Sequence, residues 1–167
     1  LDQLALKNLD STQIAKDYEK YLAEKAEWLP ETKEYFFKIA NDYNSSIITN
    51  GYQAVQGTRI NKAGIQDSVD HVFTSEYIGH SKPSPLYFEY VFNKLKIDPQ
   101  KAKILIVGDS LSSDYQSALN IKADFCWVNQ NGQPLPEKYP QPNCVVEHIK
   151  DLHAIMNSSP PKLESTL

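Results

Sequence analysis

The stretch Ile104-Leu105-Ile106-Val107-Gly108-Asp109-Ser110 carries the strongest fold signal in the chain. Four consecutive apolar residues are typical of a parallel β-strand that is covered on both faces, and Gly108 is expected to end it. Acidic residues follow, with Asp109 directly after the glycine and Asp114 a short turn later. We therefore expect a central strand whose carboxyl end carries two acidic side chains.

Shorter β-type runs and helical patterns alternate along the rest of the chain. The β-type runs are 46–49, 72–75 and 125–128. The segments with helical spacing are 11–28, a second one after Pro30, 52–63, 86–95, 113–120 and 149–156. Gly64 suits a left-handed helix C-cap, and Pro85 suits a first helical turn. Strands that alternate with helices predict an α/β fold with a parallel sheet.

The composition excludes several classes of function. The 167 residues are 41% apolar and 23% charged, which is typical of one globular domain. A net charge of −4 gives no basic surface for nucleic acid or for an anionic membrane. Apolar runs are far shorter than the roughly 18 residues of a membrane span, and no signal peptide is recognisable, so a cytoplasmic location is expected. Cys126 and Cys144 are expected to be buried apolar side chains.

Polar residues follow three of the predicted strands. They are Thr49-Asn50-Gly51, the loop that ends at Lys82, and Asp109 with Asp114. Because ligands of open parallel sheets bind outside the carboxyl ends of the strands, these three clusters are expected to converge.

Each cluster suits a phosphate ester and a divalent cation. Thr49 and the backbone N–H groups of Asn50 and Gly51 can donate hydrogen bonds to phosphoryl oxygens at a helix start. Lys82 supplies a compact positive charge on a loop that Pro83 stiffens. Carboxylates are the hard oxygen ligands that Mg²⁺ prefers.

Each cluster also has a purely structural interpretation. Thr-Asn-Gly after a strand is a good turn, a single lysine is usually a surface residue, and Gly-Asp-Ser can cap a helix. Their shared position after predicted strands favours the functional interpretation.

Three segments together resemble the second, third and fourth motifs of the haloacid dehalogenase superfamily. They are Ile47-Ile48-Thr49-Asn50-Gly51, Thr74-Ser75-Glu76-Tyr77-Ile78-Gly79-His80-Ser81-Lys82-Pro83 and Ile106-Val107-Gly108-Asp109-Ser110-Leu111-Ser112-Ser113-Asp114. The likeness extends from about Tyr18 to His153 and is greatest to the pyrimidine 5′-nucleotidase-like subgroup.

The resemblance implies a three-layer, Rossmann-like core and a Mg²⁺-dependent phosphomonoesterase that works through an aspartyl-phosphate. It implies that Thr49 and Asn50 hold the phosphoryl group, with Gly51 beside them, and that Lys82 positions nucleophile and phosphate. It implies that Asp109 and Asp114 bind Mg²⁺. The expected substrate is a small phosphorylated metabolite, with nucleoside monophosphates as one class.

The first motif of this family, an apolar strand that ends in Asp-x-Asp-x-Thr, is not found. The nearest match, 8–12, places Asn8 where the nucleophilic carboxylate should be, and no apolar strand precedes it. We therefore predict that this chain alone is inactive and that a central strand is missing from its sheet. An N-terminal fragment, a strand swapped from a second copy, or direct pairing of the two flanking strands could close the gap. The expected division is a helical cap remnant at 1–28, the core at 29–157 and a flexible tail at 158–167.

Two other functions stay open at this point. One is a non-catalytic phosphate- or metal-binding fragment or pseudoenzyme. The other is a metal-independent 2-haloacid dehalogenase with the same fold, although two acidic residues in the fourth motif favour the phosphatase.

Overall fold

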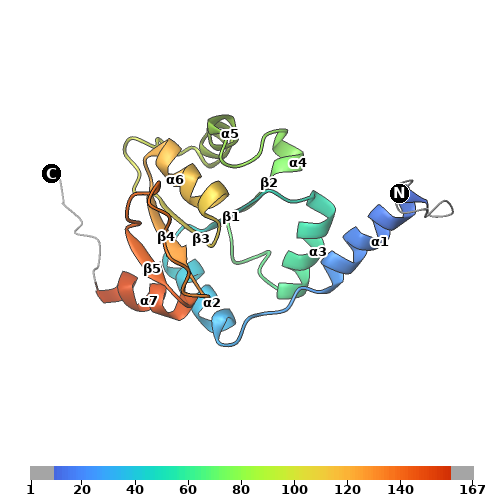
Figure 1. Ribbon diagram of the computed structural model, residues 1–167, viewed down its shortest axis with the longest axis horizontal. Coiled ribbons are helices and arrows are strands. Elements are labelled where there is room, and N and C mark those ends of the chain that lie inside the picture. The colour runs from blue at the N-terminus through green and yellow to red at the C-terminus, as the bar shows by residue number, and fades with distance from the viewer. Residues whose placement is uncertain (1–9, 159–167) are drawn as a thin grey trace.

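The computed structural model describes residues 10–158 and contains parallel strands that alternate with helices (Figure 1). The strands are β1 (Ser46–Thr49), β2 (His71–Thr74), β3 (Leu105–Gly108), β4 (Asp124–Val128) and β5 (Cys144–Val146). The helices are α1 (Ser11–Glu24), α2 (Thr32–Asp42), α3 (Gln53–Ala63), α4 (Ser75–Ile78), α5 (Pro85–Leu95), the π-helical turn η2 (Leu111–Tyr115), α6 (Gln116–Ile121) and α7 (Ile149–Ser158). The predicted parallel α/β fold is confirmed.

The sheet consists of two separate pieces within the described residues. β1 pairs with β2 alone, in parallel, with Thr49 opposite Thr74. β3, β4 and β5 form a second parallel sheet in that order, with Gly108 opposite Trp127. In residues 10–158 each of β1 and β3 therefore has one edge without a strand partner, as expected for a sheet that lacks a central strand. Direct pairing of β1 with β3 does not occur there.

One hydrophobic core nevertheless joins the two sheets. Phe73 of β2 and Ile106 of β3 belong to the same buried cluster, and helix α5 packs against both of them through Tyr87 and Phe88. The remaining buried members are Val91, Tyr115, Ala118, Phe125 and Trp127. Helices α5 and α6 lie together above the strands in Figure 1, so this layer holds the two pieces of the sheet on one side.

The opposite face is covered only in part. There α2 and α7 pack over β4 and β5 around Cys126, Val146 and Leu152. On β3, Leu105 and Val107 are 37% and 39% exposed, whereas Ile106 is buried. The prediction that β3 is covered on both faces is thus wrong for this chain, because the α2–α7 layer stops at the neighbouring strands.

Local sequence signals account for several helix ends. Asp10 caps α1 by accepting a hydrogen bond from the Thr12 amide at 2.9 Å. Gly64 ends α3 in the left-handed conformation, with φ at 69°. Pro85 begins α5. The predicted first helix is too long, since α1 ends at Glu24.

Three short elements escape the sequence patterns. They are α4, η2 and β5, of three to five residues each.

Helix α1 packs on α3, where Lys62 donates to the Glu24 carbonyl at 3.0 Å. The division of the chain into a cap remnant at 1–28 and a core at 29–157 stays a prediction. Ser158 still belongs to α7, and 159–167 of the predicted tail lie outside the described residues.

No helix of residues 10–158 has both the length and the apolar character that crossing a bilayer requires.

Tyr87 links β1 to β2 near the ends that carry the predicted site. Its hydroxyl donates to the Phe73 carbonyl at 2.8 Å and accepts from the Thr49 amide at 3.2 Å. The residue is fully buried, and this burial raises the pKa of the phenol well above its usual value. The hydroxyl therefore satisfies two backbone groups, one buried and one partly buried.

Replacing Tyr87 by Phe is expected to lower the free energy of unfolding by about 1–2 kcal/mol, because these two backbone groups lose their partner. Urea denaturation would measure the change. Tyr18→Phe is the matched control, since Tyr18 is 61% exposed on α1 and should shift stability by less than about 0.5 kcal/mol. Equal stability of the two variants would contradict the assigned role of the hydroxyl.

Candidate functional site

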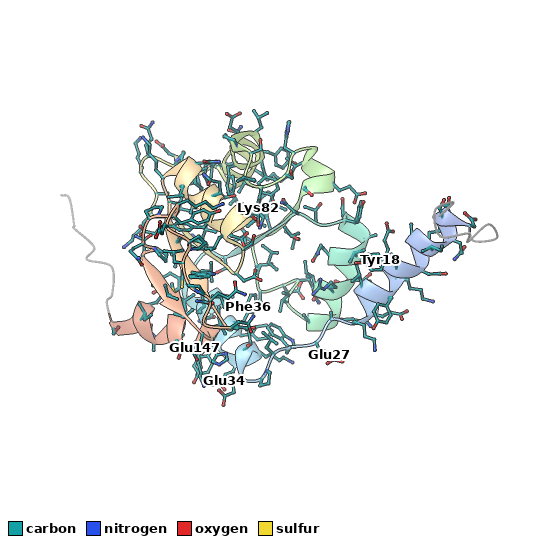
Figure 2. The ribbon with its side chains drawn as sticks, viewed as in Figure 1. Tyr18, Glu27, Glu34, Phe36, Lys82 and Glu147 are labelled. Atoms are coloured by element: carbon teal, nitrogen blue, oxygen red, sulfur yellow. The ribbon has the colours of Figure 1, made fainter. Side chains whose placement is uncertain are left out.

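Lys82 lies where the two sheets approach each other. Its ammonium donates to the Ile48 carbonyl of β1 at 3.0 Å and to Asp114 Oδ1, in the turn after β3, at 2.6 Å. The Lys82 side chain is only 8% exposed, and Figure 2 shows it near the middle of the molecule. One cation thus contacts groups from both pieces of the sheet.

The backbone of Lys82 is held separately from its side chain. Asn50 Nδ2 donates to the Lys82 carbonyl at 2.8 Å, and Asn50 Oδ1 accepts from the Lys82 amide at 2.7 Å. Asn120 Nδ2 donates to the next carbonyl, that of Pro83, at 2.8 Å. The paired bonds from Asn50 fix the loop that presents the lysine.

Asp114 is buried through the geometry of η2. The turn begins at Ser110, whose hydroxyl accepts from the Ser113 amide at 3.2 Å and whose own amide donates to Asp114 Oδ2 at 3.2 Å. The carboxylate then lies so close to Gly108 that a Cβ on residue 108 would overlap with it. Gly108 therefore serves the site as well as the strand end.

Asp109 occupies a different environment. The residue is exposed, and its backbone carbonyl accepts from Trp127 Nε1 at 3.1 Å. It lies directly after β3, at the same end of that strand as Asp114. An exposed carboxylate at this position can offer oxygen ligands to a cation.

The chemistry of these two carboxylates fits Mg²⁺, which takes one or two protein carboxylates and keeps several waters. Asp114 already accepts from Lys82 and from Ser110. Residues 10–158 contain no group of three or more Asp, Glu, His or Cys side chains arranged for a metal ion. Asp109 and Asp114 are therefore the described residues that could hold Mg²⁺ at this edge.

The structure brings the predicted site residues together unevenly. Lys82 contacts both Asp114 and Asn50, and Thr49 and Gly51 flank Asn50 at the end of β1. Sequence reasoning missed Tyr87, which holds the Thr49 amide, because its position at helical spacing indicates only an apolar face.

Sequence reasoning also missed Glu76. Its Oε2 accepts from the Gln53 amide at 2.7 Å, so a carboxylate already occupies one donor at the start of α3. A carboxylate opposite a helix N-terminus is the signal that could have found it.

Replacing Lys82 by Met is expected to lower the free energy of unfolding by about 3–5 kcal/mol, because Asp114 remains as a buried, unpaired charge. The double variant Lys82→Met/Asp114→Leu should recover much of this loss. Lys38→Met is the control, since the Lys38–Glu34 pair is 46% and 68% exposed and should matter by less than about 1 kcal/mol. Urea denaturation would measure the stability of the three variants. A double variant that is the least stable of the three would contradict the assigned role of the Lys82–Asp114 pair.

Comparisons with known proteins agree with this geometry. Residues 2–128 match the family model described as haloacid dehalogenase-like hydrolase. The chain is 27% identical to pyrimidine 5′-nucleotidase YjjG of Escherichia coli, over 89% of this chain and 65% of that protein. It therefore spans less than two thirds of the length of this relative.

Solved structures share the fold. The putative HAD-hydrolase YfnB from Bacillus subtilis, bound to magnesium, superposes with a TM-score of 0.77 at 25% identity, over 92% of this chain and 67% of that one. The L-2-haloacid dehalogenase from Xanthobacter autotrophicus reaches 0.77 at 19% identity, over 93% and 70%, which shows likeness of fold alone. Fold, motif positions and family model agree, and the chain belongs to the haloacid dehalogenase-like hydrolase family.

Proposed function

We propose that the complete protein is a Mg²⁺-dependent phosphomonoester hydrolase that acts on a small phosphorylated metabolite. The observation that carries this proposal is the buried Lys82 ammonium, held between the end of β1 and Asp114 at the edge of the sheet where the other site residues lie. The name of the Escherichia coli relative supports a nucleoside monophosphate as the substrate class. A cytoplasmic location remains a prediction from the sequence.

In this proposal the residues at the sheet edge have distinct tasks. The Thr49 hydroxyl and the backbone N–H of Asn50 hold phosphoryl oxygens, and Lys82 offsets the negative charge of phosphate and nucleophile. Asp109 and Asp114 hold Mg²⁺, which would neutralise charge on the phosphoryl oxygens when bound. The nucleophilic carboxylate of the family's first motif is not provided by the 167 residues, so this chain alone is predicted to be inactive.

The dehalogenase alternative is less well supported. Asp109 and Asp114 place two acidic residues after β3, which a metal-independent reaction does not need. The non-catalytic alternative keeps the same phosphate and metal residues without turnover, and it is the expected behaviour of this chain by itself.

We also propose that the space between β1 and β3 receives one parallel strand from an N-terminal fragment. The unpaired edges of β1 and β3 in the described residues support this. Unpaired backbone groups are costly when water is excluded, so an added strand satisfies them on both sides. A strand swapped from a second copy is the alternative source.

Activity is the direct test of the hydrolase. This chain and a version extended through the family's first motif would be assayed on an aryl phosphate with Mg²⁺ and with a chelator. We expect activity only in the extended protein with Mg²⁺, and Asp109→Asn should lower kcat at least about 100-fold through loss of a metal ligand. Asp98→Asn, on an exposed surface pair, is the control. Undiminished hydrolysis of the aryl phosphate with chelator would contradict the proposed Mg²⁺ dependence.

Strand addition can be tested without activity. A peptide with a five-residue apolar strand followed by Asp-x-Asp-x-Thr should raise the melting temperature of this chain, because it binds the folded state. The same peptide with a proline in the centre of the strand is the control, since it lacks a ladder N–H. A chain that is monomeric in size exclusion and indifferent to both peptides would overturn the proposal.

A further inference from the structure

A cavity of about 430 Å³ adjoins the candidate site. Two loops form its walls: the β1–α3 loop contributes Asn50 and Tyr52, and the segment after β2 contributes Ser75, Glu76, His80 and Ser81. A larger cavity of about 560 Å³ includes Ser45 and Asp70, which precede β1 and β2, and so lies at the opposite end of these strands.

The cavity and the phosphate residues share a wall. Asn50, whose amide holds the Lys82 backbone, also lines the cavity, as does Gly51. A phosphoryl group at Thr49 and Asn50 would therefore have the cavity beside it.

Hydrogen bonds between the two loops preform this cavity. Glu76 Oε2 accepts from the Gln53 amide at 2.7 Å, which ties the second loop to the start of α3. The two bonds between Asn50 and Lys82 tie the loops again at the other end. A site whose walls are fixed in this way loses little conformational entropy when a ligand binds.

The lining has the chemistry of a site for a hydroxylated ring. Tyr52 is 58% exposed, so its aromatic ring is accessible to a ligand. Ser75 and Ser81 provide hydroxyl groups, and His80 provides an imidazole. Small-ligand sites commonly range from about 300 to 1,000 Å³, which is more than a phosphate ion alone occupies.

We infer that this cavity binds the alcohol portion of the phosphate ester, a ring that bears hydroxyl groups, with Tyr52 against the ring face. The inference rests on the proposed function, because it assigns the neighbouring phosphoryl group to Thr49 and Asn50. It names Tyr52 as a specificity-determining residue that leaves phosphate binding itself unchanged.

Binding to this 167-residue chain tests the inference. Dissociation constants of a nucleoside 5′-monophosphate and of methyl phosphate would be measured by ligand-observed NMR with Mg²⁺ present. Both probes carry the same phosphate group, and we expect the nucleotide to bind about tenfold more tightly through ring stacking. Tyr52→Ala should remove this difference and leave methyl phosphate unaffected, whereas Tyr52→Phe should preserve it.

Tyr77→Ala is the matched control, because Tyr77 is 67% exposed on α4 and does not line the cavity. Equal affinity of the two probes, or a nucleotide preference that survives in Tyr52→Ala, would overturn the subsite and leave the proposed function intact. Equal weakening of both probes by Tyr52→Ala would also overturn it, since the residue would then support the phosphate loop. Absence of binding by either probe would contradict the phosphate binding proposed for this chain, and the subsite with it.

Discussion

The placement of one buried ammonium constrains the whole functional edge of this molecule. A lysine that is almost shielded from water needs an anion and further acceptors within hydrogen-bond distance, because burial of an unpaired charge is costly. Lys82 finds them in the Ile48 carbonyl of β1 and in the Asp114 carboxylate of the turn after β3. The Ser110 amide holds that carboxylate in place, and Gly108 leaves room for it. The roles of Ser110 and Gly108 thus follow from the position of a single charge.

The packing of the core explains how such a site coexists with a divided sheet. The buried cluster under α5 includes side chains from β2, β3 and β4, so apolar contact on one face connects strands that share no backbone ladder. Hydrophobic burial is non-directional and tolerates a missing strand better than hydrogen bonding does. The other face shows the cost, since apolar side chains of β3 remain exposed there.

The sequence predicts those parts of the fold that local patterns determine. The run at 104–107, the turn glycine at 64 and the proline at 85 each act within a few residues, and the corresponding elements were found within a few positions. β5 was missed because a strand of three residues has almost no periodicity of its own. The exposure of Leu105 and Val107 depends on which layer lies over β3, and no local pattern records that.

The same distinction holds for the site. Residue types and strand ends sufficed to group Thr49, Lys82 and Asp114 at one edge. The pairing of Lys82 with Asp114 spans more than 30 positions along the chain. The hydrogen bond between the Thr49 amide and the Tyr87 hydroxyl spans about 40 positions. Contacts at such separation depend on the folded topology, and a single sequence does not reveal them.

The Asn50 side chain hydrogen-bonds to the main-chain atoms of residue 82. The side chain of residue 82 is held by other groups. Asn50 binds a backbone amide and a backbone carbonyl, and nineteen of the twenty amino acids have both groups. The backbone position of residue 82 is thus independent of the side chain at that position. Two separate sets of contacts hold residue 82: Asn50 fixes its backbone, and Asp114 pairs with its charge, so a change of side chain disturbs the second set and leaves the first in place.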